Sequence, residues 1–270
     1  MKVKKLLRKL KIHPRKSLGQ NFLTNRNIAE RIVKLSGAKK DETIIEIGVG
    51  TGVLTEEITK HAKNVIGFEI DRNMRKLHRD LLSMDNVEII YDDFLKQDLY
   101  NYSVDKLKYI ANIPYNITSP LLEKIVFNGP KFISAVFMVQ KEFAERMLAR
   151  HGSKKYGSMT VKLKTFLNIN REMNISKRNF YPVPNIDTVV IKLDFKKNIP
   201  IDFSNRKAFN SFVNVCFSHR RKQLKNNLKG LVEKPEEFLE KYEINPKIRA
   251  EELKIDQFVT LFKEYKRVVK

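Results

Sequence analysis

Five apolar runs alternate with helix-like segments over residues 43–150, and this alternation restricts the possible fold more than any other feature. The runs are TIIEI, NVIGFEI, NVEIIY, KYIAN and SAVFMVQ. Near-continuous apolar runs of this length are typical of strands that are buried on both faces of a sheet. Because strands that alternate with helices form parallel sheets, we expect an α/β, Rossmann-like, mostly parallel doubly wound sheet.

Helix signals lie between these strands. Thr24 or Asn25 precedes apolar residues at helical spacing and Gly37 follows them, which predicts a helix between a polar cap and a glycine stop. Residues 72–84, 119–129 and 141–150 are also predicted to be helical. In such a fold, ligands bind at the carboxyl ends of the strands.

The pattern changes after residue 197, where helical periodicities continue and no convincing strand follows. We therefore expect two domains, residues 1–197 with the sheet and residues 198–270 as a small all-helical domain. The segment FSHRRKQLKNNL, residues 217–228, is predicted to be a basic helix. Arg220, Arg221, Lys222 and Lys225 would form its cationic face and bind RNA, with a solvated helix surface as the alternative.

The chain is strongly basic, with a formal net charge of +22 over 270 residues. Such an excess repels itself in the folded state and suits a polyanionic partner, nucleic acid before an anionic membrane. Residues 1–17 contain no acid and predict a basic arm for RNA, with a transit peptide or a solvated tail as alternatives. The single cysteine, Cys216, allows no internal disulfide, and with His219 it lacks the further ligands of a metal site.

A glycine-rich turn, EIGVGTG, follows the first apolar run, and acids end the next two runs. Gly48, Gly50 and Gly52 allow a sharp turn and the close approach of a ligand. Glu69 could accept both ribose hydroxyls and Asp93 an adenine amine, while Glu46 could face a positive group. These carboxylates suit an adenosine cofactor without a pyrophosphate, such as S-adenosylmethionine.

The fourth run ends in Asn112–Tyr115, Asn-Ile-Pro-Tyr, at the same expected sheet edge. An adenine N6 amine is a poor nucleophile, and acceptors for both of its protons favour a more available lone pair. The side-chain oxygen of Asn112 and a carbonyl near Pro114 are such acceptors, and Tyr115 could stack on a base. Phe180, which precedes two stiffening prolines, could close the other face of that base.

These segments together resemble one family, the ribosomal RNA adenine dimethyltransferases of the small-subunit type. The resemblance rests on KSLGQNFL, EIGVGTGVLTE, FEID, DDFL, ANIPYNITSPLL, AVFMVQKEFAERM, FYPVPNIDTVVIKL, FSHRRKQLKNNL and RAEELKIDQFVTL. It covers nearly the full chain and implies the class I methyltransferase fold. It further implies N6,N6-dimethylation of two adjacent adenosines in a hairpin loop near the 3′ end of small-subunit rRNA, in subunit biogenesis.

The resemblance also implies which residues form the site. The S-adenosylmethionine contacts would be Asn21, Leu23, Gly48, Glu69, Asp93 and Asn112. The target adenine would lie against Asn112, Pro114, Tyr115 and Phe180. The substrate would be a pre-formed small subunit, and we expect a cytoplasmic monomer with no membrane partner.

Two alternatives remain open from the sequence. Many members of the family have Leu where this chain has Ile113, and Asn-Ile-Pro-Tyr is frequent in related enzymes that methylate one large-subunit adenine and confer macrolide resistance. A non-catalytic assembly factor on the same scaffold is the second alternative. The intact Asn112, Pro114, Tyr115 and Glu69 argue against that second alternative, because a protein without catalysis has no need of them.

Overall fold

The computed structural model describes residues 3–268, and they form two compact units. The first unit extends to Ala144 and includes Ile169–Phe195. The second contains Glu145–Asn168 and the chain from Lys196 onward. The expected boundary after residue 197 is close to the last point at which the chain passes from the first unit to the second, but that boundary leaves Glu145–Asn168 in the first domain. These residues belong to the second unit because helix α6 (Ser158–Phe166) packs against helices α7 (Arg206–Cys216) and α10 (Ile255–Val268).

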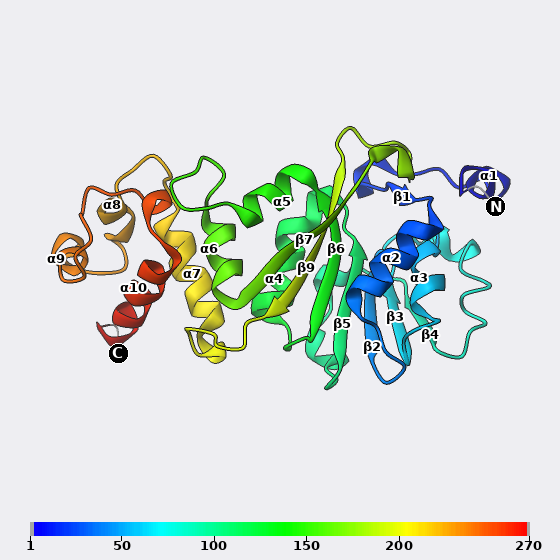
Figure 1. The fold of residues 1–270 in the computed structure, drawn as a ribbon, viewed down its shortest axis with the longest axis horizontal. Helices are drawn as coiled ribbons and strands as arrows, with labels where there is room; N and C mark the ends of the chain where they lie inside the picture. The colour runs from blue at the N-terminus through cyan, green and yellow to red at the C-terminus, as the bar shows by residue number, and fades with distance from the viewer. Residues whose placement is uncertain (1–2, 269–270) are drawn as a thin grey trace. The chain divides into compact units, whose positions relative to one another are not determined.

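The first unit is built on a seven-stranded sheet of order β4-β3-β2-β5-β6-β9-β7 (Figure 1). The strands are β2 (Thr43–Ile47), β3 (Asn64–Phe68), β4 (Val87–Ile90), β5 (Leu107–Asn112), β6 (Ser134–Gln140), β7 (Leu167–Ile175) and β9 (Thr188–Phe195). Strands β2 to β6 pair in parallel, and β9 pairs antiparallel with β6. The predicted α/β fold with a mostly parallel sheet is therefore confirmed.

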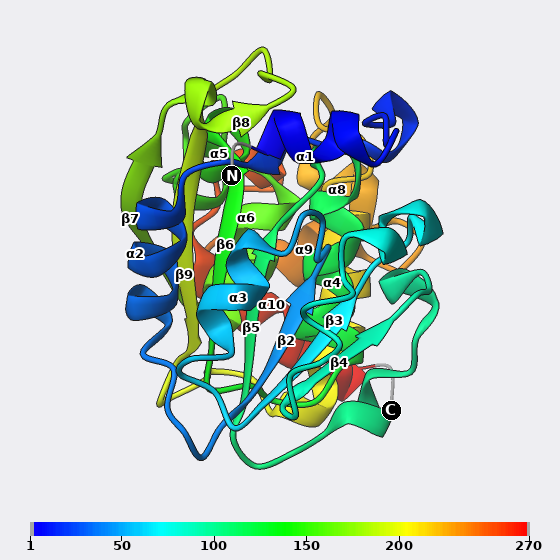
Figure 2. The ribbon, with the colours of Figure 1, turned by 90° about the vertical axis from the view of Figure 1, so that its right-hand side faces the viewer.

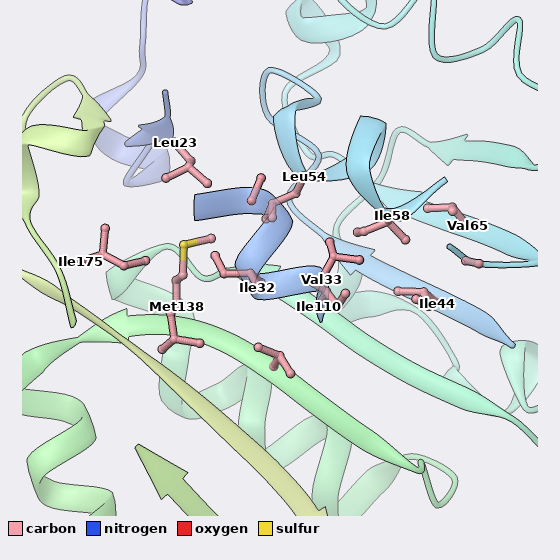
Figure 3. Close-up of a cluster of buried hydrophobic side chains, with 14 of the residues drawn as sticks. Leu23, Ile32, Val33, Ile44, Leu54, Ile58, Val65, Ile110, Met138 and Ile175 are labelled. Carbon is pink, nitrogen blue, oxygen red and sulfur yellow. The ribbon is translucent and has the colours of Figure 1, made fainter. Parts of the chain in front are cut away.

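Helices cover both faces of this sheet. Figure 2 shows α2 (Arg26–Ser36) and α4 (Thr118–Asn128) on opposite sides of the strands, and α3 (Val53–Ile58) packs beside α2. The apolar cluster under α2 and α3 is drawn in Figure 3. Its helix side chains include Ile32 and Leu54, and its sheet side chains include Ile44, Ile110 and Met138. All five are almost completely buried, so this core fixes the strand ends that carry the site.

Local signals determine the ends of α2. The side chain of Asn25 accepts a hydrogen bond from the backbone N–H of Asn27 at 3.1 Å, which caps the first turn. Gly37 ends the helix with a φ of 59°, a left-handed conformation that favours glycine. The predicted cap and stop are both confirmed.

The helix predicted over residues 72–84 is wrong. Only a short 3-10 helix, Arg72–Lys76, forms there, and turns follow it. The three buried side chains of residues 72–84 have different partners. Met74 packs against the amino-terminal arm, Leu81 contacts Val49 and Ile89, and His78 binds the glycine-rich turn. Because one straight helix cannot satisfy these contacts, they override the local helical preference.

The amino-terminal arm is ordered over its described residues. Helix α1 (Val3–Lys9) buries Val3 and Leu7, which pack with Ile12, Phe22 and Met74. Strand β1 (Phe22–Leu23) then pairs antiparallel with strand β8 (Phe180–Tyr181). The arm is thus attached, through β1, to a strand that lies far away in the sequence, β8.

The second unit is helical. The helices not yet given are α5 (Lys141–Leu148), which begins in the first unit and ends in the second, α8 (Leu224–Leu228) and α9 (Pro235–Glu240). The basic helix predicted over residues 217–228 is wrong, since α7 ends at Cys216 and turns lead to α8. The Asn227 side chain explains the break, because its amide donates to the carbonyls of Cys216 and His219 at 2.7 and 3.3 Å. Among the described residues, no helix is long and apolar enough to span a membrane.

Candidate active site

A cavity of about 200 Å³ lies at the carboxyl ends of the parallel strands, where this fold class binds ligands. Eight of the sequence-predicted residues that line it are Asn21, Leu23, Gly48, Glu69, Asp93, Asn112, Pro114 and Tyr115. They come from the arm, from the turn after β2 and from the ends of β3, β4 and β5. The structure therefore brings together eight residues that are spread over almost one hundred positions of the sequence.

The glycine-rich turn is bound to the end of β3 by a buried carboxylate. The backbone N–H of Gly50 donates to one oxygen of Glu69 at 2.8 Å, and the N–H of Asp71 donates to the other at 2.8 Å. Glu69 is 4% exposed, and burial raises the pKa of its carboxyl. Since each carboxylate oxygen has two lone pairs, both can still accept a ligand hydroxyl. This geometry suits the two neighbouring hydroxyls of a ribose.

Asp93 follows β4 and lines the cavity. Its Oδ1 accepts from the backbone N–H of Leu95 at 2.9 Å and caps a short 3-10 helix, Phe94–Lys96. No donor within residues 3–268 binds its Oδ2. That oxygen remains available to an exocyclic amine of an adenine ring.

Glu46, at the end of β2, is a fully buried carboxyl with an incomplete set of partners. The hydroxyl of Thr55 donates to its Oε2 at 2.5 Å, while Oε1 has no hydrogen-bond partner among the described residues. Burial, with a smaller contribution from the nearby Glu69, raises its pKa to about 8. A buried carboxyl that lines a cavity with a vacant acceptor fits a ligand that carries a cationic group.

Asn112 has a fixed orientation. Its Nδ2 donates to the backbone carbonyl of Asn21 at 2.7 Å. Because a carbonyl can only accept, the amide nitrogen must face Asn21, and the side-chain oxygen is left as an acceptor. Tyr115 is half-buried beside it, and its hydroxyl lies 3.4 Å from that of Thr188 on β9.

The arm closes one wall of the cavity at close range. Gly19 has a φ of 63°, and a Cβ on it would lie 3.1 Å from Asn116 Oδ1 and 3.3 Å from Pro114 Cβ. Only glycine allows this backbone to approach the loop after β5 so closely. The next residue, Gln20, donates from Nε2 to Asp71 at 3.1 Å, which attaches the arm to the end of β3.

Phe180 differs from its predicted role. Its pairing with Leu23 directs it into the core beneath α2, where it is 3% exposed, and it does not line the cavity. An aromatic wall opposite Tyr115 is therefore not formed by Phe180 in this structure.

The four predicted RNA-binding cations all lie in the second unit. Arg220 pairs with Glu251 at 2.6 Å and Lys225 with Glu236 at 2.7 Å, so both are partly neutralised. Arg221 and Lys222 are exposed on the turns after α7. Their role in binding RNA stays a prediction.

His78 is a residue of the site that the sequence did not reveal. Its ring is buried and bridges the Gly50 carbonyl, 2.7 Å from Nε2, and the Tyr91 hydroxyl, 2.8 Å from Nδ1. Because the Gly50 carbonyl only accepts, Nε2 carries the hydrogen and Nδ1 accepts from Tyr91. Burial lowers the pKa of His78, which favours this neutral form. The glycine turn is thus held at its N–H by Glu69 and at its carbonyl by His78.

We expect Glu46→Gln to stabilise the protein at neutral pH. The folded carboxyl stays protonated up to about pH 8, whereas it ionises near 4.5 when unfolded, so stability falls as pH rises between these values. Glutamine cannot ionise, so it removes the cost of keeping this carboxyl protonated in the folded state. The free energy of unfolding should rise by on the order of 2–4 kcal/mol near pH 7.5 and change little near pH 4.5. Urea unfolding at both pH values measures this change, and Glu88→Gln, at an exposed residue of β4, is the control. An equal change at both pH values would contradict the burial of an ionisable group.

We expect His78→Leu to weaken binding of the cofactor predicted from the sequence, S-adenosylmethionine, by roughly 10-fold, because the glycine turn loses its hydrogen bond to the His78 ring. KM for the cofactor should rise more than kcat falls. His78→Gln can still donate to the Gly50 carbonyl and should recover part of the affinity. Isothermal titration and steady-state kinetics provide the measurement, with the exposed His61→Leu as control. Unchanged cofactor affinity in the leucine variant would remove His78 from the site.

Comparisons with known proteins identify the family to which the chain belongs. The family model for "Ribosomal RNA adenine dimethylase" matches residues 12–267. A protein of Levilactobacillus brevis named ribosomal RNA small subunit methyltransferase A is 38% identical, over 96% of this chain and 93% of that protein.

Two solved structures are also similar. A dimethyladenosine transferase from Plasmodium falciparum superposes with a TM-score of 0.78 and 29% identity, over 91% of this chain and 98% of that one. The 23S rRNA methyltransferase ErmE superposes with a TM-score of 0.68 over 91% of this chain and 100% of that one, and at 24% identity it shows a shared fold alone. The fold is that of class I methyltransferases, and the match of the family model over nearly the whole chain shows that this protein belongs to the ribosomal RNA adenine dimethylase family.

Proposed function

We propose that this protein uses S-adenosylmethionine to dimethylate the N6 amines of two adjacent adenosines. The target is a hairpin loop near the 3′ end of the small-subunit rRNA, and the substrate is a pre-formed small subunit. Membership of the family and a relative named for small-subunit rRNA support this proposal. The observation that carries it is the orientation of Asn112, whose side-chain oxygen is left free as an acceptor.

The hydrogen-bond acceptors of the cavity fit the proposed cofactor. When bound, S-adenosylmethionine supplies an electrophilic methyl group on a sulfonium. Glu69 would bind the ribose hydroxyls, and the free oxygen of Asp93 would accept from the adenine amine. The vacant oxygen of Glu46 offers an acceptor for the ammonium of the methionine moiety. Asn21, Leu23 and Gly48 would complete the walls with their backbone.

The target amine would be positioned by acceptors rather than by a strong base. Asn112 Oδ1 would accept one of its protons. The Pro114 carbonyl already accepts from the Ile117 N–H at 3.1 Å and from the Thr118 hydroxyl at 3.4 Å, which occupies both of its lone pairs. The second acceptor would therefore be the carbonyl of Ile113, which also lines the cavity. These two acceptors favour a tetrahedral nitrogen with an available lone pair. The amine loses a proton after attack, and alignment of the reacting atoms can supply roughly 7–11 kcal/mol.

Tyr115 would hold the flipped-out base by stacking. Its hydroxyl is steadied by Thr188, which limits the ring to few positions before the base arrives. Stacking of a base on an aromatic side chain contributes roughly 1–3 kcal/mol. The base must leave its helix to reach this ring, which favours a loop over a duplex as substrate.

The test of the function uses labelled S-adenosylmethionine with under-methylated small and large subunits, kept separate. We expect label only in the small subunit, in two adjacent dimethyladenosines located by mass spectrometry of RNA fragments. Label confined to an adenine of the large subunit would instead support the macrolide-resistance activity. Tight subunit binding with no label would support a non-catalytic assembly factor.

We expect Asn112→Ala to lower kcat roughly 100- to 1,000-fold, because the amine loses a preorganised partner in the transition state. Binding of the subunit should stay unchanged, since one amide contributes little to a contact dominated by phosphates. Asn101→Ala, an exposed asparagine outside the cavity lining, is the matched control. Normal turnover by the Asn112 variant would show that the acceptor is assigned to the wrong residue.

A further inference from the structure

Helix α1 presents an exposed face that carries only cations. Lys4, Lys5, Arg8 and Lys9 are all exposed. The last three lie one, four and five positions after Lys4, which places all four on one side of the helix. None of the four forms an ion pair with any residue in the range 3–268. No acid precedes Glu30 in the sequence, so the arm itself offers no counter-charge.

The opposite face of α1 is fixed to the wall of the cavity. Val3 and Leu7 are 6% and 1% exposed, and they pack in a cluster with Phe22, which itself lines the cavity. Tyr181 of β8 packs against the same cluster, and the Lys4 ammonium lies 5.7 Å from the centre of its ring. Figure 2 shows α1 beside β8. The cationic face is therefore held next to the site by apolar contacts.

This arrangement is unfavourable for the helix alone. The pairs Lys4–Arg8 and Lys5–Lys9 are like charges one turn apart, and each pair destabilises by about 0.2–0.5 kcal/mol. Lys4 and Lys5 also lie in the first turn, where the helix dipole disfavours cations. A helix of seven residues does not persist in isolation, so its apolar contacts hold it against this repulsion. Binding of a polyanion would remove the repulsion.

We propose that the cationic face of α1 binds the phosphate backbone of the RNA next to the target adenosines. This inference rests on the proposed function and adds a contact surface to it. Charge complementarity favours RNA, because phosphates are its most exposed groups. A lipid surface is disfavoured, because a membrane-bound amphipathic helix inserts its apolar face, and here Val3 and Leu7 are buried in the protein.

The test is a combined variant, Lys4→Gln, Lys5→Gln, Arg8→Gln and Lys9→Gln, in the full-length protein. Glutamine keeps helix propensity and removes the charge. We expect affinity for the under-methylated small subunit to fall roughly 10- to 100-fold at 0.15 M salt. The plot of log affinity against log salt should become less steep by about 3 units of slope, because four lost phosphate contacts each contribute roughly 0.7–0.9.

Matched controls separate this effect from net charge and from unfolding. Lys34, Lys39, Lys40 and Lys63 are exposed, lie away from the cavity lining and, changed together to Gln, remove the same charge. This control should bind the subunit with a near-normal salt slope. The variant Lys4→Arg, Lys5→Arg and Lys9→Arg keeps the α1 charge and should bind normally. None of the three proteins should unfold at a lower temperature than the unaltered protein, and cofactor affinity should be unchanged in all three.

Two results would overturn the inference. One is an unchanged subunit affinity and salt slope in the α1 glutamine variant. The other is a loss of binding to phosphatidylglycerol vesicles with no loss of subunit binding, which would assign the face to a membrane. Failure of the proposed function is seen separately, as absence of small-subunit label with the unaltered protein. In that case a lower salt slope of the glutamine variant on RNA would still show the phosphate contact.

Discussion

The site depends on one buried carboxylate, Glu69, which binds the backbone of two neighbouring strand ends at once. One oxygen holds the turn after β2 through Gly50, and the other holds the turn after β3 through Asp71. Asp71 in turn accepts from Gln20, so the arm is connected to the same centre. Without the carboxylate, the buried N–H of Asp71 and the partly buried N–H of Gly50 would lose their partners. A buried donor left without a partner costs roughly 1–3 kcal/mol. The cofactor site and the arm that closes it thus share a single support.

Much of this site could be predicted because its residue types report local geometry. Glycines at positive φ, an acid at a strand end and an amide before Pro114 each have few structural interpretations. The segments that could not be predicted are those whose conformation is set by distant partners. Residues 72–84 lose their helix to contacts such as His78 with Gly50, and α7 ends early because Asn227 turns back to cap Cys216.

The secondary structure of two further elements is hard to predict because their sequence patterns are atypical. Helix α6 buries nearly all of its residues, so its sequence shows no polar face and no helical period. Strand β7 has the opposite composition, since most of its residues are polar and exposed, and it lacks the apolar run expected of a strand in such a sheet. Phe180 shows the limit of motif reasoning, because its position in β8, paired with Leu23, decides which way the ring points.

The pairing of β1 with β8 joins Phe22 to Tyr181 and Leu23 to Phe180, so the two segments are separated by most of the first unit. Long-range pairing of this kind forms late, since closing a long loop is entropically unfavourable until other contacts exist. During synthesis, β1 leaves the ribosome early but has no partner until the chain has grown past Tyr181. The Asn21 carbonyl, which orients Asn112, is next to β1. A growing chain therefore cannot assemble a competent methylation site before about two thirds of it has been made.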